Sequence, residues 1–383
     1  MPNDLKRTVL VIQRRMTHYR VPLFERLRDE LSERDCRLML AYGQPTAAEE
    51  RKQDAAEVPW AERLTTRYFL GGRICWQPFS RLISASDLVV MTHENKLIHN
   101  LVPQLLMTDV KVALWGHGAN LQGNPVSLRE RFKRITARYA DWWFAYTQLS
   151  LPLIVQSGFP EERVTVLNNA VDTTKLSIMT ANVSAQELAS LRRRLGLTGN
   201  RVGVYVGSLY QEKRIDFMLS AVAEVRRRLP DFEFLIIGAG PLGDVVERFC
   251  ANNPWAKYLG MQKGQEKVNA VALAQVMINP GLVGLGILDA FVCGVPMVTT
   301  DCGLHSPEIA YLENGNNGLI TANTLEDYVA AVVSVLQDGF AQRRLRQGCL
   351  ASAAKYTVEN MARNFAQGAV SCLDAPFFRT RRH

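Results

Sequence analysis

Two glycine-containing stretches in the second half of the chain have residue types that suit the binding of a diphosphate. The first begins with Gly207 and ends with Asp216, reads GSLYQEKRID, and follows an apolar run that predicts a strand. Gly207 lets the backbone approach a ligand, and Lys213 follows in the same loop. An ammonium group beyond the carboxyl end of a strand can neutralise phosphate charge, so this loop predicts an anion site.

The second stretch joins a glycine-rich loop to the start of a helix. It runs from Pro280 to Ala290 and reads PGLVGLGILDA. Exposed amides at the amino end of a helix bind anions, and Asp289 in the first turn is placed to accept hydroxyl groups of a ribose. Together the two stretches predict a nucleoside diphosphate site.

A third glycine pattern, Gly238 to Gly243, satisfies GxGxxG directly after a predicted strand. Taken alone it is typical of dinucleotide binding. However, Pro241 lies inside the turn, and no Asp or Glu ends the next strand, where a ribose partner is expected. We therefore favour the diphosphate site over a nicotinamide or flavin site.

Short apolar runs alternate with helical patterns in both halves of the chain, which favours parallel, doubly wound sheets. A polar region near Thr173 to Gln186 contains no predicted element before a helix at Ala185 to Leu195, so we set the domain boundary there. Two such α/β halves predict a ligand-binding cleft between them. The predicted strands include Thr8 to Ile12, Arg37 to Ala41, Leu88 to Met91, Lys111 to Trp115, Trp142 to Thr147, Val164 to Leu167, Arg201 to Val206, Phe232 to Ile237, Gln275 to Asn279 and Pro296 to Thr299.

The block from Gly207 to Gly318 resembles the nucleotide-binding domain of the retaining glycosyltransferases of family 4. The matching pieces are GSLYQEKRID, FLIIGAGPLG, KYLGM, NPGLVGLGILDAFVCGVPMVTTD and HSPEIAYLENGNNGLI, with weaker matches in THYRVPLFERL, LWGHG and VLNNAVD. The resemblance implies an α/β protein with the GT-B fold, in which two Rossmann-like, doubly wound parallel-sheet domains face a cleft. Residues 1–177 with a returning terminal helix at 359–383 would bind the acceptor, and residues 178–358 would bind the nucleotide-sugar donor.

The same resemblance implies the roles of individual residues. Lys213 would bind the donor diphosphate, Asp289 would hold the donor ribose, and His117 would face the transferred sugar, so these three are the predicted catalytic residues. A histidine buried between Gly116 and Gly118 and bonded to backbone is the alternative for His117. No metal and no cofactor beyond the nucleotide-diphosphate sugar are expected. The full predicted donor site is Gly207, Ser208, Lys213, Leu282, Val283, Gly284 and Asp289.

The chain departs from the family pattern in three places. The first acid of the family's acid pair falls at Gly281, Ser208 replaces an arginine, and a basic loop replaces a glycine-rich one after the first strand. Loss of one carboxylate partner would slow a transferase by roughly ten- to a hundredfold without abolishing it. Backbone groups at Gly281 to Val283, or Glu308, are candidate replacements.

The basic loop suggests where an acceptor binds. Arg15, His18 and Arg20 follow the first predicted strand, together with Arg14, and we assign the first three as acceptor-binding residues for a phosphate-bearing group such as a lipid-linked diphosphate sugar. Ordinary solvated surface charge is the alternative.

The amino-acid composition favours a globular protein. Apolar residues make up 47% and charged residues 21% of the 383 residues, which is typical of a globular chain. No apolar run is long enough to cross a bilayer, and the amino terminus resembles no secretory signal, so a cytoplasmic location is expected. The net charge is +8, and residues 1–175 hold 24 basic against 19 acidic side chains.

The basic balance favours anionic partners. A helix predicted at Leu128 to Tyr139 carries five basic residues, and the tail from Phe377 to His383 places two aromatic residues before three arginines. Both suggest peripheral association with an anionic membrane surface, on the inner face. A solvated helix face and a solvated, disordered terminus are the respective alternatives. No zinc finger, basic zipper or P-loop is present, and no nucleic-acid partner is expected.

The sequence therefore predicts a glycosyltransferase of the hexosyltransferase type. It would move a sugar from a UDP- or GDP-linked donor to a hydroxyl of a sugar or lipid-linked acceptor, with retention of anomeric configuration, in polysaccharide or glycolipid synthesis. Two alternatives stay open: a non-catalytic GT-B binding subunit, which the missing acid at Gly281 favours, and a nucleotide-sugar epimerase.

Overall fold

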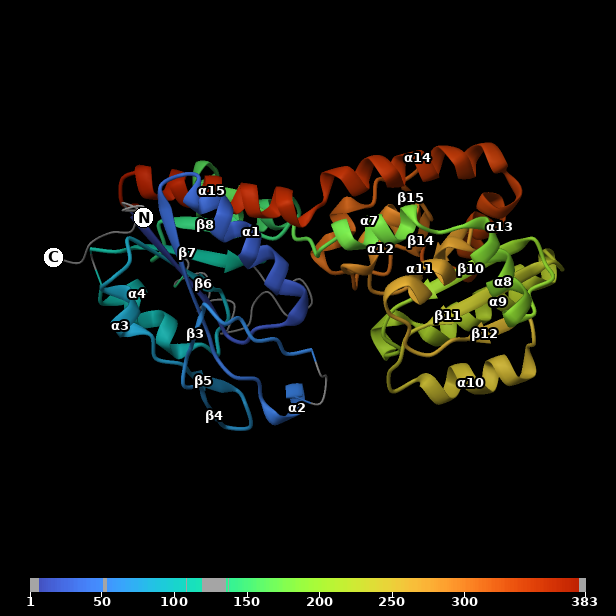
Figure 1. Cartoon of the computed structure of the whole chain (residues 1–383), viewed down its shortest axis with the longest axis horizontal. Coiled ribbons are helices and arrows are strands. Elements are labelled where there is room, and N and C mark those ends of the chain that lie inside the picture. Colours follow the sequence, from blue (N-terminus) through green and yellow to red (C-terminus); the bar gives the residue numbers. More distant parts are fainter. Residues whose placement is uncertain (1–6, 51–53, 108, 119–135, 137, 379–383) are drawn as a thin grey trace. The chain divides into compact units, whose positions relative to one another are not determined.

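The chain forms two compact units. One contains residues Met1–Val171 together with Val358–His383, and the other contains Asp172–Thr357. The predicted boundaries, after residues 177 and 358, lie within a few residues of these divisions. The computed structural model describes residues 7–50, 54–107, 109–118, 136 and 138–378, and Figure 1 shows these parts coloured along the sequence.

The first unit is built on a seven-stranded sheet with the order β3-β2-β1-β6-β7-β8-β9. Every neighbouring pair in it is parallel. A separate antiparallel hairpin is formed by β4 and β5. The elements are β1 (Arg7–Gln13), η1 (His18–Arg20), α1 (Val21–Ser32), β2 (Cys36–Tyr42), α2 (Ala47–Glu50), β3 (Glu62–Arg63), β4 (Arg67–Phe69), β5 (Ile74–Trp76), α3 (Ser80–Ile83), β6 (Leu88–Thr92), η2 (Ile98–Asn100), α4 (Leu101–Leu105), β7 (Lys111–Gly116), β8 (Trp142–Ala145), α6 (Ser150–Gln156), η3 (Glu161–Arg163), β9 (Val164–Val166) and α15 (Val358–Asp374).

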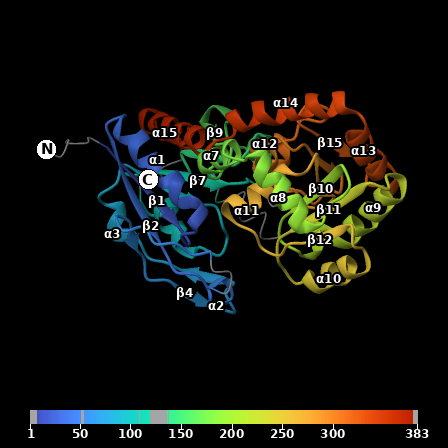
Figure 2. The same cartoon turned by 45° about the vertical axis from the view of Figure 1, so that its right-hand side comes forward.

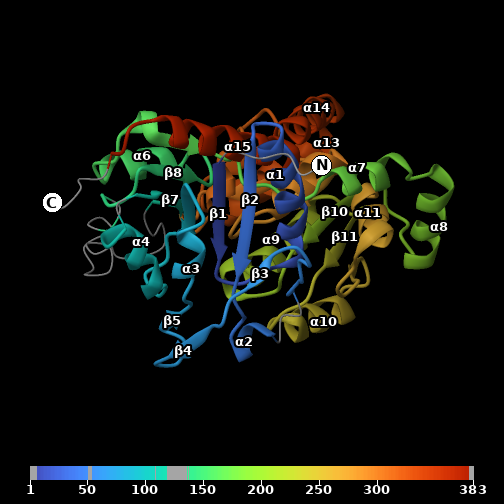
Figure 3. The same ribbon diagram turned by 60° about the vertical axis from the view of Figure 1, so that its left-hand side comes forward.

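Helices cover both faces of this sheet, which explains why its central strands are apolar along their whole length. On one face Phe365 of α15 stacks on Phe144 of β8, with ring centroids 4.4 Å apart, and contacts Trp115 of β7. On the other face, Ile83 of α3 and Ile154 of α6 belong to one core cluster, which also contains the strand residues whose side chains point to that face. Helix α15 contacts α1 and strands β6 to β9 (Figure 3), so the last helix of the chain completes the first unit.

The second unit is a six-stranded sheet with the order β12-β11-β10-β13-β14-β15, again parallel throughout (Figure 2). The strand order reverses between β10 and β13, and ligands of such sheets bind at the carboxyl ends of the strands beside this point. The elements are α7 (Thr174–Ala181), α8 (Ala185–Leu195), β10 (Arg201–Val206), η4 (Gln211–Lys213), α9 (Ile215–Arg228), β11 (Phe232–Ile237), α10 (Gly243–Asn252), β12 (Ala256–Tyr258), α11 (Gly264–Ala272), β13 (Val276–Ile278), α12 (Gly286–Cys293), β14 (Met297–Thr300), η5 (Pro307–Tyr311), β15 (Gly318–Thr321), α13 (Leu325–Gln337) and α14 (Gly339–Lys355).

One predicted loop is a helix. The polar region after Thr173 contains α7, and of its eight residues only Leu176 is buried, so the sequence has no apolar stripe to reveal it. Leu176 packs against Val268 of α11 and Val292 of α12. Contact with these two helices therefore stabilises a segment that its own sequence does not mark as helical.

Two predicted membrane-binding segments have different outcomes. The basic helix at Leu128 to Tyr139 lies largely outside the described residues. In the tail, the Phe378 amide donates a hydrogen bond to Asp141 Oδ1 at 2.9 Å, and the Phe378 ring lies 5.5 Å from that of Phe159. Phe378 is thus partly held against the first unit, although 40% of it is exposed. Among the helices that the structure describes, none combines the length and hydropathy of a membrane span.

Candidate functional site

The two diphosphate-binding stretches meet inside the second unit. Lys213 lies in η4, beyond the end of β10, and its Nζ donates a hydrogen bond to the Leu282 carbonyl oxygen at 2.6 Å. The Leu282 amide donates in turn to the Glu212 carbonyl oxygen at 2.9 Å. Because β10 and β13 are parallel neighbours, their carboxyl ends bring these two loops to the same edge of the sheet.

The missing acid at Gly281 has a steric explanation. A Cβ atom at this position would lie 2.5 Å from the Glu212 and Lys213 carbonyl oxygens, closer than real Cβ contacts. The close approach of the two loops that positions Lys213 therefore excludes any side chain at residue 281. A carboxylate at this position is incompatible with the observed contact between the loops.

Burial changes the titration of Lys213. Desolvation lowers the pKa of its ammonium group from 10.5 to about 8, and the negative charge of the buried Glu308 partly opposes this shift. Lys213 is therefore mostly cationic at neutral pH but titrates within reach of ordinary assay conditions. A diphosphate placed against it would raise its pKa again, since an adjacent negative charge favours the ammonium form.

The loop before α12 uses some of its amides internally. The Leu282 amide is bonded to Glu212, and the Val283 amide donates to Nδ1 of His305 at 3.2 Å. Among the described residues, the amides of Gly284 and Leu285 have no hydrogen-bond acceptor. Of the three predicted phosphate-binding residues, Gly284 is thus the one whose amide is available, and it is separated from α12 only by the N-cap residue Leu285.

His305 holds this loop in place, although it is not among the site residues predicted from the sequence. Its Nδ1 accepts from Val283 and its Nε2 donates to the Thr300 carbonyl oxygen at 2.7 Å, so the ring must be neutral. Burial lowers the pKa of His305, which favours that neutral form. Only the contact with Val283, far away in sequence, reveals the role of this histidine.

Asp289 lies in the first turn of α12, as predicted, but is not isolated. Its Oδ1 accepts a hydrogen bond from Nζ of Lys267, in α11, at 2.9 Å. A carboxylate has further acceptor positions, so this ion pair orients Asp289 and leaves Oδ2 able to accept hydroxyl groups.

The glycines of the GxGxxG pattern serve packing. A Cβ at Gly238 would collide with the Gly207 carbonyl oxygen, and one at Gly240 would lie 2.5 Å from the Leu209 carbonyl oxygen. The Leu209 amide also donates to Ala239 O at 3.0 Å. This turn therefore supports the loop that carries Gly207 and Ser208, which accounts for both glycines without a dinucleotide.

His117 follows β7 in the first unit and is exposed, so the alternative of a buried histidine is wrong. Its ring lies 4.3 Å from the ring of Tyr146. Gly118 has φ of +80°, and a Cβ there would lie 2.5 Å from Cγ1 of Ile154, so glycine is required after the histidine. The strand end thus presents His117 on the surface of the first unit.

Most of the second unit is similar to a known protein family. Residues 200–338 match the family described as "Glycosyl transferases group 1". This region therefore resembles a group 1 glycosyltransferase domain. The predicted fold class, two Rossmann-like doubly wound parallel-sheet units of the GT-B type, is confirmed by solved structures: that of Anabaena Alr3699/HepE in complex with UDP has a TM-score of 0.70 at 17% identity and covers 95% of this chain and 100% of that one.

Curated relatives match over part of their length. The "GDP-mannose-dependent alpha-(1-6)-phosphatidylinositol monomannoside mannosyltransferase" of Mycolicibacterium smegmatis is 30% identical over 161 residues, 39% of this chain and 41% of that protein. The "Alpha-monoglucosyldiacylglycerol synthase" of Acholeplasma laidlawii is 24% identical over 191 residues, 48% of this chain and 47% of that protein. The chain thus spans less than half the length of these two relatives.

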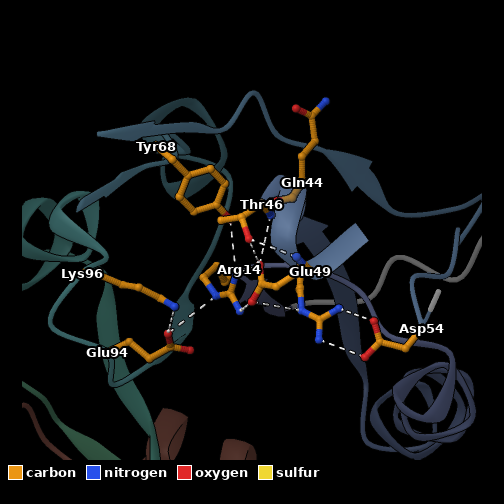
Figure 4. A network of polar contacts seen from close by, with 9 residues as sticks. Arg14, Gln44, Thr46, Glu49, Asp54, Tyr68, Glu94 and Lys96 are labelled. Carbon is orange, nitrogen blue, oxygen red and sulfur yellow. Dashed lines mark hydrogen bonds and ion pairs between the residues drawn. The ribbon is translucent and has the colours of Figure 1, made fainter. Parts of the chain in front are cut away.

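The predicted acceptor-binding loop is only partly open to a ligand. Figure 4 shows Arg14 bonded to Glu49 and Tyr68, with Glu94 and Lys96 completing the network. Hydrogen bonds from Arg14 hold the pKa of the Glu49 carboxyl far below its usual value. In this network the charge of Arg14 already has its counter-ion.

Arg15 and Arg20, both predicted to bind the acceptor, differ in their surroundings. Arg15 donates to both carboxylate oxygens of Asp54, at 2.6 and 3.0 Å, so its charge is also compensated. His18 is exposed, with Nδ1 3.3 Å from the Asp54 carbonyl oxygen. Arg20 is buried against aromatic rings. The structure therefore separates three residues that the sequence treated as one group.

Proposed function

We propose that this protein is a glycosyltransferase that moves a sugar from a nucleoside-diphosphate donor to a hydroxyl acceptor. The observation that supports this most strongly is the contact of Lys213 with the loop whose available amides precede α12. A partly buried ammonium group, together with amides that have no acceptor among the described residues, is suited to a diphosphate leaving group. The group 1 domain contains all of these residues.

In the reaction, the bond between the sugar and the diphosphate breaks, the acceptor oxygen bonds to the anomeric carbon, and the proton of the acceptor hydroxyl passes to the departing diphosphate. Negative charge accumulates on the departing diphosphate, and Lys213 with the Gly284 and Leu285 amides would stabilise it. Asp289, held by Lys267, would accept hydroxyl groups of the donor ribose. His117 would face the transferred sugar, and the reaction would retain the anomeric configuration, as the resemblance to family 4 implies.

The donor would be UDP- or GDP-linked, and the acceptor a sugar or lipid-linked molecule in polysaccharide or glycolipid synthesis. Relatives named for GDP-mannose, phosphatidylinositol mannoside and diacylglycerol products support a lipid acceptor. We further propose that the protein works in the cytoplasm, peripherally on the inner face of an anionic membrane, which the net charge of +8 would favour.

The test measures binding and turnover separately. Calorimetric titration of the full chain with UDP and with GDP should show one site for at least one of them. Mass spectrometry of reactions with nucleotide sugars and acceptor extracts should then show sugar transfer. Binding without turnover would assign the protein as a binding subunit, donor isomerisation without acceptor would assign an epimerase, and failure to bind either nucleotide would refute the proposal.

A further inference from the structure

The first unit contains a buried guanidinium group that makes no hydrogen bond to any described residue. Only 8% of Arg20 is exposed, and its Nη1 is buried without a hydrogen-bond partner. Among the described residues, no carboxylate forms an ion pair with it. Burial of a cation without an anion is unfavourable, so such a group usually has a ligand or a function.

The surroundings of Arg20 are aromatic and contain a second unsatisfied donor. Its guanidinium carbon lies 5.0 Å from the ring centroid of Trp115 and 5.8 Å from that of Tyr146. Trp115 is 1% exposed, and its Nε1 also has no hydrogen-bond partner. Cation–π contacts stabilise the charge of Arg20 in part, but they leave the N–H donors of both residues unsatisfied.

The acids of the neighbouring loop do not reach Arg20. Glu49 and Asp54 are bonded to Arg14 and Arg15, and the first turn of α1, which follows Arg20 directly, contains no acidic residue. The loop therefore compensates two of its arginines and leaves the third, the most buried one, uncompensated. The exposed ring of His117 contacts the Tyr146 ring at a tilt of 37°, so the predicted sugar-facing histidine and Arg20 share one aromatic neighbour.

We propose that Arg20 binds a phosphate group of the acceptor. This inference rests on the proposed function and narrows its acceptor to phosphate-bearing molecules. A guanidinium binds phosphate through parallel N–H donors, and a phosphate supplies the acceptor oxygens that Arg20 and Trp115 lack. The site belongs to the first unit, whereas Lys213 and its loop belong to the second.

The experiment uses inorganic pyrophosphate as the probe, titrated calorimetrically into the full chain with the nucleotide site already saturated by UDP or GDP. We expect the wild-type protein to bind pyrophosphate and Arg20→Gln to bind it about ten- to a hundredfold more weakly. Arg20→Lys keeps the charge and should recover part of this loss. Arg37→Gln, which removes an exposed arginine of β2, is the matched control and should match the wild type.

The unfolding temperature distinguishes a structural role of Arg20 from anion binding. Because its charge is unpaired, Arg20→Gln should unfold at the same temperature as the wild type, or higher, when no anion is present. Equal pyrophosphate affinity of the wild type and Arg20→Gln would overturn the proposal, as would a loss of nucleotide affinity in Arg20→Gln, which would assign Arg20 to the donor. If the wild type binds neither UDP nor GDP, the proposed function fails, while a pyrophosphate titration without nucleotide still tests Arg20.

Discussion

The two units use their basic residues in different ways. In the second unit Lys213 is held by a backbone carbonyl and faces a loop with available amides. In the first unit Arg14 and Arg15 are compensated by Glu49 and Asp54, and only Arg20 of the three lacks a counter-ion among the described residues. Basic residues near a strand end therefore indicate anion binding only when the protein does not already use their charges.

Replacement of Lys213 should have the largest effect. Lys213→Gln removes the cation that donates to the Leu282 carbonyl oxygen in the loop before α12, so we expect kcat for sugar transfer to fall by roughly a hundred- to a thousandfold. Steady-state kinetics with a saturating donor measures this effect. Lys263→Gln, which changes an exposed lysine of the same unit, is the control, and an equal loss in both variants would contradict a specific role for Lys213.

An added side chain at position 281 should displace the backbone of the same site. Gly281→Ala forces apart the loops of Lys213 and Leu282, so we expect the free energy of unfolding to decrease by about 1 to 3 kcal/mol. Urea denaturation measures it. At Gly284 an added Cβ meets nothing closer than 3.7 Å, so Gly284→Ala should unfold like the wild type. Gly281→Glu, which restores the family's acid, should lower activity rather than raise it.

The pKa of Lys213 predicts how nucleotide affinity depends on pH. The ammonium form binds the diphosphate, and in the free protein it is lost as the pH rises through about 8. Affinity for UDP or GDP should therefore fall above pH 8, by up to about tenfold per pH unit, and binding there should be accompanied by proton uptake. Calorimetry in buffers of different ionisation enthalpy measures both. Lys213→Gln should lose this pH dependence, and its persistence in that variant would assign it to another group.

The smallest effect is expected at Arg15. Arg15→Gln removes a charge that Asp54 already compensates, so the Michaelis constant for the acceptor should change less than twofold. Loss of the ion pair with Asp54 should cost about 1 kcal/mol or less of stability, because both side chains are partly exposed. If Arg15→Gln raised this Michaelis constant as much as Arg20→Gln, both arginines would bind the acceptor, as the sequence predicted.

Much of the second unit could be predicted because its sequence repeats simple local signals. The bounds of β10, β11 and α8 agree with the prediction, since continuous apolar strands and a Ser184 capping box are local features. Helix α7 was missed because only Leu176 is buried. Its stability depends on packing against α11 and α12, which no local pattern encodes.

The site was predictable in its residues but not in its contacts. Lys213, Gly284 and Asp289 were selected as candidates from motif spacing, and the meeting of their loops follows from parallel strand pairing. The ion pair of Lys267 with Asp289 and the His305 contact with Val283 join separate segments, so no local pattern predicts either of them.

By itself, the sequence determined the order of strands and helices, the division into two α/β halves and the loops that contain the candidate donor site. These follow from apolar periodicity and glycine placement, which act over a few residues. Tertiary structure alone decided which charges are compensated, since Glu49, Asp54 and Glu94 reach the arginines from distant segments. It also decided that residue 281 must be glycine, because only the folded loops bring another backbone into the space of its side chain.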